Sequence, residues 1–106
     1  MISNTEAVLI FRGWAESKSR LRMVVQYPTV TFASFCSIWK VDAENATFLI
    51  GPEENKTVIT FSLVGLGFDF ADAPNKERAA LAVGVEVESG IVAVGQGLRL
   101  VVMLLK

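Results

Sequence analysis

The 106-residue chain contains no histidine and a single cysteine. Histidine is the commonest general base near neutral pH and a frequent metal ligand, so its absence excludes most acid–base catalysis and most transition-metal sites. Only a carboxylate site for a hard cation remains open as a metal site. The sequence neighbours of Cys36 are apolar or neutral. Because nothing beside it in the sequence would form the thiolate, Cys36 is predicted to be a buried structural residue.

A long, uninterrupted apolar run is also missing. The longest uncharged stretch, Met23 to Trp39, contains Gln26, Pro28 and several serines and threonines, which a lipid bilayer would penalise. Residues 1–6 have no basic segment of the kind that opens a secretory signal. We therefore expect a cytoplasmic protein that makes no membrane contact, with Cys36 reduced.

Apolar residues, in contrast, are abundant. Hydrophobic types make up 52% of the chain before its eight glycines are counted, whereas ordinary soluble domains reach about 45–50% with glycine included. The length predicts one domain over residues 1–106. Because so small a domain has a limited core, the surplus indicates a subunit interface or an apolar pocket. The alternative is that alanine and valine are simply frequent here.

Positive charge is scarce and unevenly distributed. The net charge is −1, yet residues 1–40 carry five basic and two acidic side chains, while residues 41–106 carry five basic and nine acidic ones. The N-terminal excess gives four candidate binding residues: Arg12, Lys18, Arg20 and Arg22. Two residues apart on a predicted strand, Arg20 and Arg22 would share one face and could engage a phosphate or an acidic partner. The alternative is a solvated outer face.

The first half of the chain predicts a helix followed by strands. Ser3-x-x-Glu6 fits a capping box, and the apolar residues that follow have helical spacing, so we predict a helix over Glu6 to Ala15, with a short buried strand as the alternative. Leu21 to Tyr27 alternates as a half-buried strand, and a turn is placed at Pro28. Val30 to Val41 has large residues on both faces, which predicts a strand that is buried on both sides or strongly bent.

Short strands and turns are predicted for the rest of the chain. The expected elements are a turn over 42–45, a strand Ala46 to Ile50, a turn over 51–55, a strand Thr57 to Val64, a bend at Gly65 and Gly67, an acidic loop Asp69 to Asn75, one helical turn over Asn75 to Ala80, a strand from Leu81 that ends at a Ser89-Gly90 turn, a strand Ile91 to Val94, a Gly95-Gln96-Gly97 turn and a strand Leu98 to Leu105. The predicted fold is mainly β: an N-terminal helix followed by a small, strongly bent antiparallel barrel or sandwich with extra C-terminal strands.

This order of elements resembles the Sm-like and SH3-like small barrels. The resemblance rests on four stretches: Leu21 to Tyr27, Val30 to Asp42, Ala46 to Ile50 and Thr57 to Val64. The chain departs from the Sm-like pattern at Ala33 and Ser34, where a glycine is usual, and it lacks the Lys-His pair of the bacterial members. The resemblance to the Sm-like proteins implies RNA binding, in which Arg12, Lys18, Arg20 and Arg22 would contact phosphates and an aromatic side chain would stack on a base.

The first functional hypothesis is a non-enzymatic domain that acts by binding or self-association. Residues 98–105 are apolar on both faces, which an exposed edge strand could not tolerate without aggregation. A second subunit would cover them, so we expect a homo-oligomer with an interface at Leu98, Leu100, Val102 and Leu104. The second hypothesis is the Sm-like RNA-binding protein. For both tryptophans, Trp14 and Trp39, packing in the core or an interface is favoured over base stacking.

A third hypothesis is a small enzyme that uses the carboxylates Asp69, Asp72 and Glu77, although a solvated loop accounts for them more simply. A cation site at Asp42, Glu44 and Asn45 would lack the glycine and terminal glutamate of a calcium loop. The two Gly-x-Gly segments lack the further residues of a phosphate-binding loop and are predicted to be turns. We therefore expect no catalytic residue, no metal and no cofactor.

Overall fold

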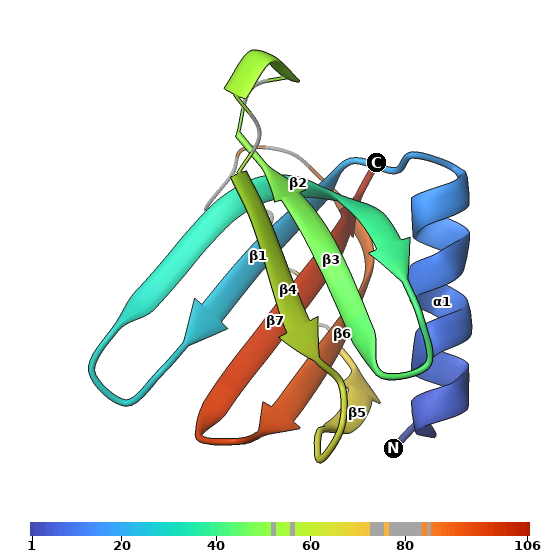
Figure 1. The fold of residues 1–106 in the computed structure, drawn as a ribbon, viewed down its shortest axis with the longest axis vertical. Helices are drawn as coiled ribbons and strands as arrows, with labels where there is room; N and C mark the ends of the chain where they lie inside the picture. Colours follow the sequence, from blue (N-terminus) through green and yellow to red (C-terminus); the bar gives the residue numbers. More distant parts are fainter. Residues whose placement is uncertain (52, 56, 73–75, 77–83, 85) are drawn as a thin grey trace.

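The computed structural model describes residues 1–106 except 52, 56, 73–75, 77–83 and 85 (Figure 1). The described elements are α1 (Asn4–Glu16), β1 (Leu21–Gln26), β2 (Thr31–Val41), β3 (Asn45–Ile50), the 3₁₀ turn η1 (Glu53–Asn55), β4 (Thr57–Ser62), β5 (Gly67–Phe70), β6 (Val87–Gly95) and β7 (Leu98–Leu105). The strands form one antiparallel sheet in the order β4-β3-β2-β1-β7-β6-β5. The sheet is strongly bent but does not close into a barrel, so β4 and β5 are its edges. The predicted fold class is confirmed.

Helix α1 begins where the sequence places a cap. The Ser3 hydroxyl accepts a hydrogen bond from the Glu6 backbone N–H at 3.1 Å, which satisfies one of the free donors of the first turn. The buried face of the helix consists of Ala7, Val8, Phe11 and Trp14. The prediction of a helix is therefore confirmed, and the alternative of a buried strand is wrong.

Phe11 is the centre of the core. Its ring makes edge-to-face contacts with Trp14, Phe48 and Phe68, at centroid distances of 5.7, 6.4 and 6.4 Å. Phe48 lies on β3 and Phe68 on β5, which belong to opposite halves of the sheet. The helix thus packs against one face of the sheet, which we call the helix-side face, and joins its two halves. The other side is the outer face.

Strand β2 is long and bent, as predicted, with a bulge between Ile38 and Lys40. It is not buried on both sides. Phe35 on the outer face is 37% exposed, and Trp39 in the bulge is 64% exposed. That alternative in the prediction is therefore wrong, and the large residues on the second face of β2 belong to the surface.

The C-terminal strand β7 has the bounds predicted for it and lies inside the sheet, between β1 and β6. Leu100 and Val102 are fully buried in the main core, and Leu98 and Leu104 are partly buried against it. Val101 and Met103 form a second apolar cluster on the outer face with Ala71, against which Val24, Val87 and Val92 pack. Of the four residues predicted to form a subunit interface, the chain itself therefore buries Leu100 and Val102 fully and Leu98 and Leu104 in part.

Two predictions in the second half of the chain are wrong. Residues 89 and 90 do not form a turn, because β6 runs through them and pairs with β7. Gly90 is needed for close packing: a Cβ there would overlap the sulfur of Met103 and lie 3.1 Å from the Ala71 Cβ. Residues 67–70 form the edge strand β5 instead of leading into a loop. The predicted helical turn at 75–80 and the start of the strand at 81 fall mostly outside the described residues.

Candidate binding groove

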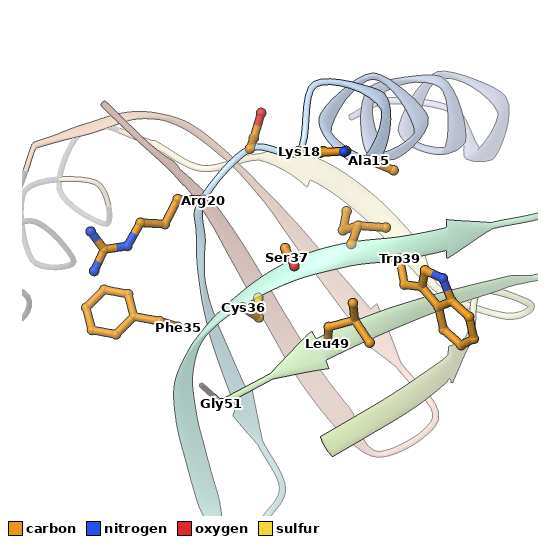
Figure 2. A pocket seen from close by; sticks show the side chains of 11 residues that line it. Ala15, Lys18, Arg20, Phe35, Cys36, Ser37, Trp39, Leu49 and Gly51 are labelled. Carbon is orange, nitrogen blue, oxygen red and sulfur yellow. The ribbon is translucent and has the colours of Figure 1, made fainter. Parts of the chain in front are cut away.

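A groove of about 750 Å³ lies where the end of α1 and the loop after it meet β2 and β3 (Figure 2). The residues that line it are Ala15, Lys18, Ser19, Arg20, Phe35, Cys36, Ser37, Ile38, Trp39, Leu49 and Gly51. Its volume lies within the range of small-ligand sites. The groove combines aromatic, aliphatic and cationic side chains.

Arg20 and Arg22 meet on a single aromatic ring. Their guanidinium carbons lie 4.8 and 4.9 Å from the centroid of Phe35. The register of β1 with β2 produces this arrangement, because Arg22 is directly opposite Phe35 and Arg20 lies two residues earlier along the chain. The contacts are cation–π interactions, each worth about 0.5–1 kcal/mol at an exposed site. The prediction that the two arginines share one face is confirmed.

The positive charges at the groove are not neutralised within the described part of the chain. Lys18 and Arg20 line the groove, Arg22 lies beside it, and no carboxylate is among the lining residues. Neither ion pair found among the described residues involves these three side chains. Like charges gathered on one ring repel each other, by on the order of 1 kcal/mol or less in water. A bound anion would remove that repulsion.

Trp39 lies at the other end of the groove from Arg20 and Phe35 (Figure 2). The bulge in β2 after Ile38 interrupts the regular register with β3, and the Trp39 side chain is 64% exposed. Tryptophan is usually packed because its ring buries a large apolar area. Trp14 follows that rule at 8% exposure, whereas Trp39 is outside the core. An exposed indole in a groove that also has cationic side chains along its lining is suited to stacking on a planar ligand.

Cys36 is buried at the groove and is chemically quiet. Burial raises the pKa of its thiol to about 12, an effect that the charge of Arg22 offsets only in part. The thiol is therefore protonated at neutral pH and is not a nucleophile. This agrees with the structural role predicted for Cys36.

The structure brings together three of the four predicted binding residues. Arg12 is exposed on α1 and is not among the residues that line the groove. Phe35, which positions both arginines, was not among the predicted site residues. Its signal was present in the sequence: a two-residue turn at Pro28 and Thr29 sets a register in which Arg22 faces Phe35.

Asp42 and Asp69, two of the carboxylates considered for a metal or catalytic site, make local structural contacts. One Asp42 carboxylate oxygen accepts hydrogen bonds from the N–H groups of Glu44 and Asn45, at 2.8 and 2.7 Å, and these bonds lower its pKa. Asp42 thus stabilises the β2–β3 turn. Asp69 lies 3.3 Å from the N-terminal amine, and Glu77 falls outside the described residues. In the part of the chain that the structure describes, no three His, Cys, Asp or Glu side chains gather as metal ligands.

Comparisons with protein-family models, with curated proteins and with solved structures found no match. Among the described residues, no helix has both the length and the apolar character that a membrane span requires. The candidate function therefore rests on the geometry of the groove.

Proposed function

We propose that the protein is a non-enzymatic binding module whose groove holds a single strand of RNA. The observation that supports this most directly is the pair Arg20 and Arg22, which are gathered on Phe35 without a carboxylate partner among the described residues. Binding without sequence preference needs cations for the phosphates and aromatic surfaces for the bases. The groove offers both within one cavity.

Trp39 favours RNA over an acidic peptide. Either ligand would neutralise Lys18, Arg20 and Arg22, but an acidic peptide supplies no planar groups for the exposed indole of Trp39. Each stacked base contributes about 1–3 kcal/mol to binding, as judged by alanine substitution of the stacking side chain. Loss of the indole should therefore weaken RNA binding and leave the binding of an acidic peptide almost unchanged.

The chemistry of the groove supports binding more than catalysis. The one thiol is protonated at neutral pH, and the lining includes no carboxylate that could act as a general base.

The test is fluorescence anisotropy with a labelled ten-nucleotide oligouridine at low ionic strength. We expect the double variant R20A/R22A to lower the affinity at least tenfold, because it removes two phosphate contacts. W39A should lower it roughly fivefold to 150-fold, the equivalent of one stacked base. The control is R12A, which removes one positive charge from a position outside the groove and should change the affinity less than twofold.

Three outcomes would contradict the proposal. The first is the absence of binding to oligouridine at low salt, and the second is a loss in R12A as large as that in R20A/R22A. The third is equal or tighter binding of a polyglutamate peptide, with no effect of W39A, which would identify an acidic polypeptide as the ligand. Circular dichroism of each variant shows that the fold is intact.

A further inference from the structure

The two edges of the sheet differ in how they are protected. At β5, the N–H of Ile2 donates to the Phe68 carbonyl at 3.1 Å, and the N-terminal amine lies 3.3 Å from Asp69. The start of the chain therefore covers that edge. Charged side chains and proline are the usual protection of an edge strand against pairing with another strand. The sequence of β4, TVITFS, contains neither. Figure 1 shows β4 at the front of the molecule, and none of the described strands pairs with its free side.

The register identifies which backbone groups of β4 face outward. The N–H of Leu63 donates to the Glu44 carbonyl, so residue 63 and every second residue before it face β3. Val58, Thr60 and Ser62 therefore direct their N–H and C=O groups away from the sheet. The Ser62 carbonyl accepts a bond from the Gln96 side chain at 3.5 Å. At Val58 and Thr60, no hydrogen bond to the backbone from any described residue is present.

We infer that β4 pairs antiparallel with β4 of a second copy of this chain. The inference is independent of the RNA-binding groove. A two-fold interface needs a surface that complements itself. With Val58 of one protomer opposite Thr60 of the other, all the outward donors and acceptors of both residues are used, four hydrogen bonds in total. No charged side chain of β4 enters the interface, so nothing on the strand repels its own copy.

This pairing also places the exposed Val58 in contact with the partner. Its side chain is 49% exposed on the outer face, where cross-strand apolar pairs stabilise a sheet. Ile59 of the two protomers would face each other across the two-fold axis. The result is a continuous sheet that extends through both protomers. The self-association predicted from the sequence thereby gains a surface on β4 in place of residues 98–104.

The test compares three variants by size-exclusion chromatography with light scattering over a range of protein concentrations. Val58→Pro removes an outward N–H without breaking a bond to β3, and Val58→Lys introduces a charge on the edge. The matched control is Val94→Lys: Val94 is 54% exposed on β6, an inner strand. We expect wild type and Val94→Lys to approach twice the 11.5 kDa chain mass at high micromolar concentration, and both Val58 variants to stay monomeric.

Three results would overturn the inference. The first is a wild-type protein that stays monomeric at high micromolar concentration. The second is a pair of Val58 variants that associate as strongly as Val94→Lys. The third is an open-ended series of larger species, because two-fold pairing of one edge stops at the dimer. If Val58→Pro fails to fold, Val58→Lys alone decides, since a lysine is tolerated on an edge strand. RNA binding by a strictly monomeric protein would reject this interface and leave the groove unaffected.

Discussion

Arg22 lies directly opposite Phe35 across the β1–β2 pair, with its guanidinium carbon 4.9 Å from the centre of the ring. The same ring holds Arg20 at 4.8 Å. In the proposed function Phe35 is a positioning residue: its ring holds two long, flexible side chains together, which would lower the entropy that they lose on binding RNA.

Replacement of Phe35 tests that role. In Phe35→Ala both arginines remain but lose their support, so we expect the affinity for oligouridine to fall severalfold. Phe35→Tyr keeps an aromatic face and should retain most of the affinity, while Phe35→Leu keeps apolar bulk and should behave like alanine. Anisotropy titrations of the three variants decide. Equal affinities for the leucine and tyrosine variants would show that the cation–π contacts are irrelevant to binding.

Gln96 offers a test of how the bent sheet is held. It lies in the β6–β7 turn, and its side-chain amide donates to the carbonyl of Val64 in the connection between β4 and β5. The same amide also donates to the Ser62 carbonyl at 3.5 Å, so we expect Gln96→Ala to lower the free energy of unfolding by about 1–2 kcal/mol, the net value of two hydrogen bonds of which one is long. Gln96 has a φ of 52°, so Gln96→Gly should lose less, because glycine adopts that conformation at little cost. Urea denaturation measures both. Equal losses would indicate that backbone conformation contributes nothing there.

Two glycines should respond oppositely to alanine. At Gly90 the new Cβ would overlap the Met103 sulfur and lie 3.2 Å from the Val102 carbonyl, so we expect a loss of about 1–3 kcal/mol from overpacking. At Gly13, inside α1, a Cβ meets no atom within 4 Å, and alanine should raise stability by about 1 kcal/mol. Thermal and urea unfolding measure the pair. A stable Gly90→Ala protein would contradict the path of β6 through this residue.

The Cys36 thiol predicts a pH dependence. Burial raises its pKa in the folded protein from 9.0 to about 12. The folded state thus favours the protonated thiol, and the stability that this provides is present below pH 9.0 and is lost as the pH rises toward 12. Iodoacetamide should modify native Cys36 on the order of a thousandfold more slowly than the urea-unfolded chain at pH 8. Rapid modification of the native protein would show that the thiol is accessible.

The parts of the fold that depend on local pattern were predictable. The cap at Ser3 and the helical spacing after it predicted α1, and alternation from Leu21 predicted the common face of Arg20 and Arg22. The function of Gly90 was not predictable, because it depends on Met103 in a neighbouring strand. A glycine in close packing and a glycine in a turn have the same sequence signal.

The predicted interface and the position of Trp39 depended on contacts that the sequence does not reveal. A strand that is apolar on both faces must be covered, but the sequence did not indicate that other parts of the same chain cover residues 98–105. Trp39 was predicted to pack in the core or in an interface, whereas the structure leaves it outside the core, next to a β-bulge and 64% exposed. Both outcomes are decided by contacts between distant residues.

The most direct test of RNA binding in the groove is the salt dependence of oligouridine affinity. Each neutralised phosphate of a single strand contributes about 0.7 to the slope of log affinity against log salt concentration. We predict that R20A/R22A lowers the magnitude of that slope by about 1.4, while R12A leaves it unchanged. An unchanged slope in R20A/R22A would show that the two arginines do not contact phosphate and would contradict the account.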